Sequence, residues 1–195
     1  MSESTPPRPV SPRAPRDPGR AERIIAGAMA VIATQGLERL THRAVATEAG
    51  VPLGSTTYHF GSLDDIVLAA MLHAKADDTA SLAAWAQGIA HPDELAPALA
   101  QRIMDDAQRS QMVANVHLYL AAISRPQFQE VAYAWSQVMT GVLERFVDEV
   151  AAETLSGLYD ALIIRVMISG GRASRDEVER VIRRALAACR PAAVG

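Results

Sequence analysis

Apolar residues recur every three or four positions along most of the chain, with polar residues between them. The first such stripe consists of Ala21, Ile24, Ile25, Ala28, Val31 and Ile32. This spacing predicts an amphipathic helix that ends at Gly36, a residue suited to a left-handed C-cap. Asp17 is a candidate N-cap of this helix, with Pro18 in its first turn.

Two short helices are predicted next. Thr41 is the expected cap of one that carries Val45, Ala46 and Ala49 and ends at Gly50. Pro52 opens the other, which runs to about His59. Two short helices joined by a tight glycine turn have the spacing of a helix-turn-helix.

A series of longer amphipathic helices follows. Ser62 with Asp65 predicts a capping box at the start of the first, and Ser174 with Glu177 predicts another before a last helix that ends near Cys189. The intervening breaks are marked by His91-Pro92, Arg125-Pro126 and Gly170-Gly171. The pattern accommodates about nine helices and predicts an all-α fold.

Composition agrees with this fold and indicates in which cellular compartment the protein is expected. The chain has 195 residues, of which 49% are hydrophobic and only 5% aromatic, enough for a sizeable helical core. Its one cysteine, Cys189, cannot form an internal disulfide, so a reducing, cytoplasmic location is expected. No apolar run reaches the length of about 18 residues that a membrane span needs, and the N-terminus lacks the apolar segment of a signal peptide.

Charge is unevenly distributed, although the formal net charge is only −3. Residues 1–63 hold seven arginines and five acidic residues, whereas residues 64–195 are acidic overall. Residues 1–16 are rich in proline and arginine, which predicts a disordered tail with no role or, alternatively, a basic arm that touches DNA. A basic end on an acidic body indicates a nucleic-acid partner weakly.

The stretch from Gly54 to His59 is small and polar, unlike a core segment. A recognition helix places short polar side chains in the major groove, and the start of a helix attracts phosphate. The candidate DNA-contacting residues are Thr41, His42, Arg43, Leu53, Gly54, Ser55, Thr56, Thr57, Tyr58 and His59.

These motifs carry a family resemblance. The run RIIAGAMAVIATQGLERLTHRAVATEAG, the Gly54-Ser55 pair, Tyr58-His59-Phe60 and Ser62 followed by acidic residues are similar to the N-terminal domain of the TetR family of transcriptional regulators. The resemblance implies a helix-turn-helix head at residues 17–62 and a helical ligand-binding and dimerisation body at residues 63–195. It also implies a homodimer on a palindromic operator in double-stranded DNA.

In the family, a small-molecule effector moves the fourth helix and releases the DNA, so a repressor is expected; an activator, or a response to a protein partner, are alternatives. The sequence departs from the family pattern at Leu53, Thr57 and Leu63. These departures leave a further alternative, a helical small-molecule-binding protein or enzyme that has lost DNA binding.

An effector site is expected in the body, where apolar walls and a few polar groups are typical of small-molecule pockets. Aromatic, methionine and histidine residues there are more often core, so the assignment is a hypothesis. The candidates are Trp85, Met104, Asn115, His117, Trp135 and Met139, and a wider set adds Tyr119, Phe128, Tyr159 and Met167.

Two apolar stripes suggest dimerisation through residues 127–150 and 154–169. The first consists of Val131, Trp135, Val138, Val142 and Phe146. The second consists of Leu158, Leu162, Arg165, Val166 and Ser169, with the small residues Gly157 and Ala161 nearby. The alternative is that both stripes face the subunit's own core.

No enzyme chemistry is indicated. The histidines and the cysteine lack metal-ligand spacing, and there is no GxSxG, P-loop or GxGxxG motif, so no metal and no cofactor are expected. The pairs Asp64-Asp65, Asp77-Asp78 and Asp105-Asp106 are adjacent residues, which diverge by about 100° around a helix. They are interpreted as solvated helix surface.

Overall fold

The structure, a computed structural model, describes residues 19–105 and 109–189, which hold nine α-helices and no strand. The all-α prediction is therefore confirmed, while the predicted tail at residues 1–16 and the Asp17 cap lie outside the described residues. The helices are α1 (Arg20–Gln35), α2 (His42–Glu48), α3 (Leu53–His59), α4 (Leu63–Gln87), α5 (Leu95–Met104), α6 (Arg109–Ser124), α7 (Gln129–Leu143), α8 (Glu149–Ile168) and α9 (Arg175–Cys189). In these ranges, no helix is long and apolar enough to cross a bilayer.

Local sequence signals set most helix ends. Thr41 Oγ1 accepts a hydrogen bond from Ala44 N at 3.0 Å, which caps α2. Ser62 and Asp65 form the reciprocal capping box of α4, with distances of 3.1 and 2.9 Å. Short 3₁₀ turns, η2 (Pro92–Glu94) and η4 (Pro126–Phe128), precede α5 and α7. They lie where His91-Pro92 and Arg125-Pro126 predicted breaks between helices.

The head is held together by close helix packing. Gly27 on α1 lies directly against the end of α2, because a Cβ at Gly27 would be 2.9 Å from both Ala49 N and Ala49 Cβ. Gly50 turns the chain between α2 and α3 with φ of 62°, a conformation that glycine adopts without strain. These two glycines allow α1, α2 and α3 to form one compact unit.

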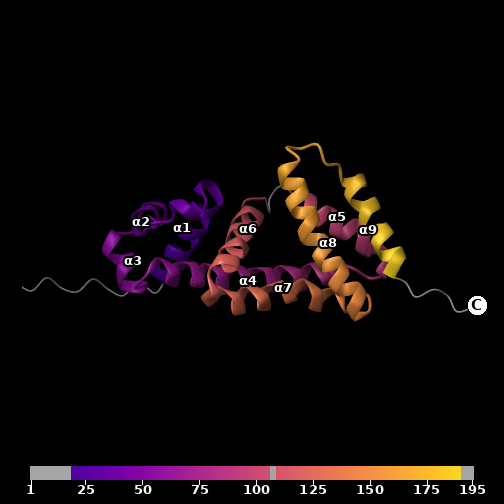
Figure 1. Cartoon of the computed structure of the whole chain (residues 1–195), viewed down its shortest axis with the longest axis horizontal. Helices are drawn as coiled ribbons and strands as arrows, with labels where there is room; N and C mark the ends of the chain where they lie inside the picture. Colours follow the sequence, from indigo (N-terminus) through magenta and orange to yellow (C-terminus); the bar gives the residue numbers. More distant parts are fainter. Residues whose placement is uncertain (1–18, 106–108, 190–195) are drawn as a thin grey trace, which may run out of the picture.

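Helix α4 connects the head to the body (Figure 1). It leaves the three head helices and runs along α7, with α6 rising beside the head and α5, α8 and α9 grouped at the far end (Figure 1). A third 3₁₀ segment, η1 (Leu37–Arg39), links α1 to α2 and contacts α6.

The core has two clusters that α4 and α7 share. One joins head residues such as Ile24 and Ile32 to Leu118 of α6 and Trp135 of α7. The other joins the ends of α4 and α7 to α5, α8 and α9. Because the head and α6 share a cluster, the head packs against the body as well as being tethered to it.

The two stripes predicted for dimerisation face the subunit's own core. Trp135 of α7 and Leu162 and Val166 of α8 are buried, and the remaining apolar members pack against the same clusters. A different face of α8 is exposed, and it includes Gly157 and Ala161. The predicted segments therefore contain an open surface, which lies beside the predicted stripe of α8 and includes the predicted small residues Gly157 and Ala161.

Candidate DNA-binding face and effector cavity

Helix α3 divides its side chains between solvent and core. Leu53, Gly54, Thr57, Tyr58 and His59 are exposed, with 67% of Tyr58 accessible. On α2, Thr41 and Arg43 are also exposed, and His42 is half-buried. These residues form an open face at the end of the head (Figure 1), available to a partner.

The structure buries Thr56 and Ser55, two of the predicted DNA-contacting residues, in the head interior. Thr56 is 0% exposed, and its hydroxyl donates to Leu53 O at 2.8 Å. Because that hydroxyl proton is engaged, its oxygen accepts from His42 Nδ1 at 3.2 Å. Ser55 is 9% exposed. These two hydroxyls support the face from beneath, since they lie on the side of α3 that packs against α1 and α2.

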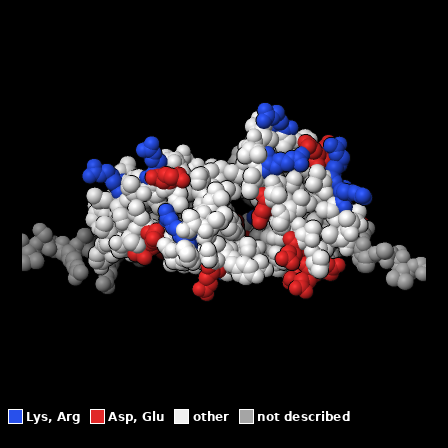
Figure 2. All heavy atoms as spheres, in the orientation of Figure 1, with Lys and Arg blue, Asp and Glu red and all other residues white. Residues whose placement is uncertain are grey.

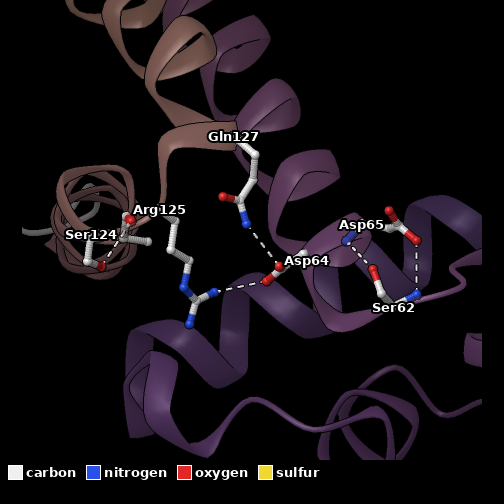
Figure 3. Close-up of polar contacts among 7 residues, drawn as sticks. Ser62, Asp64, Asp65, Ser124, Arg125 and Gln127 are labelled. Atoms are coloured by element: carbon white, nitrogen blue, oxygen red, sulfur yellow. Dashed lines mark hydrogen bonds and ion pairs between the residues drawn. The ribbon is translucent and has the colours of Figure 1, made fainter.

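The head–body junction is joined by polar contacts at the start of α4. Asp64 accepts from Arg125 Nη1 at 3.1 Å and from Gln127 Nε2 at 3.0 Å (Figure 3). Arg125 and Gln127 lie in the connection between α6 and α7. Asp64 therefore ties the first turn of α4 to the α6–α7 connection, a role that its interpretation as solvated surface missed.

A cavity of about 480 Å³ lies in the body. Residues from α4, α5, α6, α7 and α8 line it, and Figure 2 shows a hollow in the middle of the molecule with an acidic side chain beside it. The volume falls in the range of about 300–1,000 Å³ typical of small-molecule sites.

Asp78 is the polar centre of the cavity wall. Its Oδ2 accepts from Trp135 Nε1 at 2.8 Å and from Asn115 Nδ2 at 3.2 Å, so it joins α4 to both α7 and α6. Burial raises the pKa of Asp78, against the opposing effects of the Trp135 hydrogen bond and the Arg102 charge. Tyr119 stacks on Trp135, with ring centroids 4.5 Å apart.

A buried arginine occupies the α5 side of the cavity. Arg102 is 8% exposed, and its Nε donates to Tyr159 Oη at 3.2 Å. Its two terminal nitrogens donate to Ser81 Oγ at 3.3 and 3.2 Å. Burial raises the pKa of the Tyr159 phenol, so it stays neutral and can accept this bond. Arg102 is thereby fixed against α4 and α8.

Asp160 of α8 is a second carboxylate in the cavity lining. Although the side chain keeps access to solvent, desolvation by the cavity walls, and then the nearby Asp78 charge, raise the pKa of Asp160 to about 6. Together with Asp77, the part of the lining that the structure describes holds three carboxylates and one guanidinium. The cavity is therefore acidic as well as aromatic.

The structure brings together half of the predicted effector residues. Asn115, Trp135 and Met139 line the cavity, as do Tyr119 and Tyr159 from the wider set. Trp85 and Met104 pack against the second core cluster instead. His117 lies toward the head, because a Cβ at Gly36 would be 3.6 Å from its Cε1. The cavity lining therefore excludes these last three residues.

Sequence reasoning missed the charged residues of the cavity. Asp78 was interpreted as solvated surface, but it is half-buried and hydrogen-bonded to two other helices. The signal available was a set of acidic residues on the middle of α4 next to small and apolar residues. Arg102 and Asp160 carried no local signal, because only packing places them at one cavity.

Comparison with known proteins agrees with this architecture. Residues 24–70 match the family described as bacterial regulatory proteins, tetR family, and residues 90–188 match the tetracyclin repressor-like C-terminal domain. No curated protein sequence matches the chain.

Solved structures cover both parts of the chain. The multidrug binding protein EbrR, complexed with ethidium, is 33% identical with a TM-score of 0.74, over 87% of this chain and 99% of that one. A TetR family member from Streptomyces coelicolor A3, SCO1917, is 33% identical with a TM-score of 0.72, over 85% and 97%. Other EbrR structures contain imidazole, malachite green or proflavin. The two family matches together span most of the chain, and the fold agrees with these structures; this protein therefore belongs to the TetR family of transcriptional regulators.

Proposed function

We propose that this chain is a homodimeric, non-enzymatic repressor that leaves a palindromic operator when a flat organic cation enters its cavity. The observation that carries the proposal is the position of Asp78. It lies on α4, the helix that begins at the head, and it is hydrogen-bonded across the cavity wall to α6 and α7. A molecule that displaces those bonds acts directly on the helix that carries the head.

The cation class rests on the lining and on the relatives. EbrR, to which this chain is similar, is a multidrug binding protein whose structures contain ethidium, malachite green and proflavin. In this chain, the stacked Tyr119–Trp135 pair offers aromatic faces, which attract flat rings and cations. The excess of carboxylates in the lining favours positive charge.

Dimerisation is supported by the exposed face of α8. Its exposed residues follow a 4-3-4-3-4 spacing, which is the heptad pattern of a helix seam. They are Val150, Thr154, Gly157, Ala161, Ile164 and Ile168. Two copies paired through this face would form a two-fold dimer, and two-fold symmetry suits a palindromic site.

Release follows from differential binding. An effector shifts the equilibrium only by binding the released shape more tightly than the DNA-bound shape. By reciprocity, operator DNA weakens effector binding by the same factor. We expect this factor to be roughly 5–150-fold, the usual range of allosteric coupling.

The test uses fluorescence anisotropy of a labelled duplex that carries the DNA upstream of the chain's own coding sequence. Malachite green is the probe, because ethidium and proflavin intercalate into DNA and would confuse the signal. Saturating malachite green should weaken operator binding, and operator should weaken malachite green binding equally. Trp135→Ala should lower dye affinity, whereas His117→Ala, outside the cavity, should not.

Two outcomes would contradict the proposal. If the protein binds malachite green but holds the operator equally with and without it, the chain is not a dye-released repressor. If the duplex is not bound at all while the dye is, the chain is a small-molecule-binding protein that has lost DNA binding.

A further inference from the structure

The two deeper carboxylates of the cavity have different surroundings. Asp78 is engaged by Trp135 and Asn115, and the Arg102 charge opposes its own. Asp160 forms no hydrogen bond or ion pair with any other residue in the described ranges, and it keeps access to solvent. Asp160 is thus the cavity carboxylate that is open to a ligand.

The third carboxylate, Asp77, is already paired. Its Oδ2 lies 3.2 Å from His73 Nε2, one turn earlier on α4. Asp77 is also well exposed, so solvent screens its charge. Among the described residues, Asp160 is therefore the one carboxylate of the cavity lining that has no hydrogen bond or ion pair with another side chain.

The electrostatic setting of Asp160 depends on the titratable groups of the helices that line the cavity. The titratable lining groups are Asp77 and Asp78 from α4, Arg102 from α5, Tyr119 from α6 and Tyr159 beside it on α8. Helix α7 contributes no titratable group to the lining. Burial raises the pKa of both phenols, so they remain neutral near pH 7. The surrounding charge is therefore set by Asp77, Asp78 and Arg102.

Resting on the proposed function, we propose that the Asp160 carboxylate, in its charged form, pairs with the positive charge of the effector. Asp78 acts as a positioning residue: it holds Trp135 Nε1 and so fixes the indole on which Tyr119 stacks. Charge recognition and ring recognition then come from different helices, α8 and α7.

The pH dependence has a definite sign. In the free protein the pKa of Asp160 is about 6, and a bound cation lowers it because it favours the charged carboxylate. Below that pKa, the cation must displace a proton, so affinity falls as pH falls. Above it, the carboxylate is already charged and affinity is level. For one such group, affinity rises about tenfold from pH 5 to pH 7.

The experiment titrates the full chain, without DNA, with two probes from pH 5 to pH 8. Ethidium has a fixed positive charge at every pH used, and phenanthridine, compared with it at pH 7 and pH 8, is its ring system without that charge. Fluorescence gives the affinity, and calorimetry in buffers of different ionisation enthalpy counts the protons released. The variants are Asp160→Asn and, as a matched control, Glu153→Gln, which removes a carboxylate from an exposed position on α8 outside the cavity lining.

Wild type and Glu153→Gln should bind ethidium about tenfold more tightly at pH 7 than at pH 5, with proton release near pH 6. Asp160→Asn should lose most of that dependence and bind ethidium more than about tenfold more weakly at pH 7, while its phenanthridine affinity stays the same. Asp78→Ala should weaken both probes, because it frees the indole.

Ethidium binding that is unchanged in Asp160→Asn at every pH would overturn the assignment while leaving the proposed function standing. Failure of the wild type to bind ethidium at any pH would overturn both. Circular dichroism of each variant checks that it is folded.

Discussion

Single side chains at the recognition helix have two distinct tasks. Thr57 and Tyr58 are open to a partner, whereas the buried Thr56 hydroxyl bridges Leu53 O and His42 Nδ1. The bridge orients the His42 ring at the start of α2, where backbone N–H groups favour a phosphate. We expect Thr56 to affect operator binding only through the position of the His42 ring.

Thr56→Val tests this indirect role, because valine keeps the shape and removes the hydroxyl. Losing the buried bridge should lower the free energy of unfolding by about 1 kcal/mol. Operator affinity should fall by the same factor for every operator sequence, so the base preference should be unchanged. Urea unfolding and anisotropy on a panel of single-base operator variants measure these effects. A changed base preference would show that Thr56 reaches the bases.

Arg43, by contrast, is exposed on α2 and is expected to contact the phosphate backbone. Arg43→Ala should weaken binding to all sequences and lower the slope of log affinity against log salt by about 0.9 per lost contact. Anisotropy titrations from low to moderate salt measure the slope. Arg175→Ala, which removes a guanidinium from α9 at the opposite end of the molecule, should leave it unchanged. Equal slopes in both variants would show that Arg43 does not contact the phosphate backbone.

At the scale of elements, α4 is hydrogen-bonded at two places to α6, α7 and the connection between them. Asp78 is bonded to one residue from each helix, and Asp64 is bonded to the connection between them (Figure 3). The two aspartates are fourteen residues apart, about 21 Å along the helix, and on nearly the same face. The cavity end and the head end of α4 are therefore held by the same pair of helices and the connection between them.

Asp64→Ala should weaken the coupling between cavity and head. The Asp64–Arg125 ion pair is well exposed, with 49% and 39% of the two side chains accessible, so stability should change by less than about 1 kcal/mol. Without this tie, movement of α6 and α7 at the cavity is no longer passed to the first turn of α4. Malachite green should then weaken operator binding by a smaller factor than in the wild type. The coupling free energy between the two sites should fall by roughly 0.5–2 kcal/mol.

The measurement is the full cycle of dye and operator affinities, each with and without the other. Glu130→Ala, which removes an exposed carboxylate from the first turn of α7, is the control and should keep wild-type coupling. An unchanged coupling factor in Asp64→Ala would show that the head responds through another contact.

At the scale of the whole molecule, the exposed face of α8 is the surface through which we expect two copies to form the dimer. Ile168 is 75% exposed and lies outside the cavity lining, so Ile168→Asp should leave the monomer fold and dye site intact. A charge in an apolar seam should dissociate the dimer at micromolar concentration and weaken operator binding, because the two heads are no longer linked. Sedimentation velocity measures the first effect and anisotropy the second.

Tyr133→Asp is the matched control, since Tyr133 of α7 is 70% exposed but lies off the α8 face. It should remain dimeric. A dimeric Ile168→Asp protein would place the interface elsewhere.

The sequence by itself determined the helices, their ends and the family. A cap such as Thr41, the Ser62–Asp65 box and the Gly50 turn act between residues a few positions apart, so their patterns are visible in a linear sequence. Amphipathic spacing is equally local, which is why an all-α fold was predictable. The motif of the head was specific because it combined several such signals over one short segment.

Only the tertiary structure decided which face of each helix meets which partner. Thr56 and the exposed Thr57 are adjacent in sequence, yet packing against α1 and α2 buries one of them. Asp78 became a cavity residue because α6 and α7 bring donors to it from 37 and 57 positions away. A stripe of apolar residues indicates only that one face of the helix is covered. Contacts between distant segments settle whether the subunit, an effector or a second copy covers it, since burial depends on the whole packed assembly.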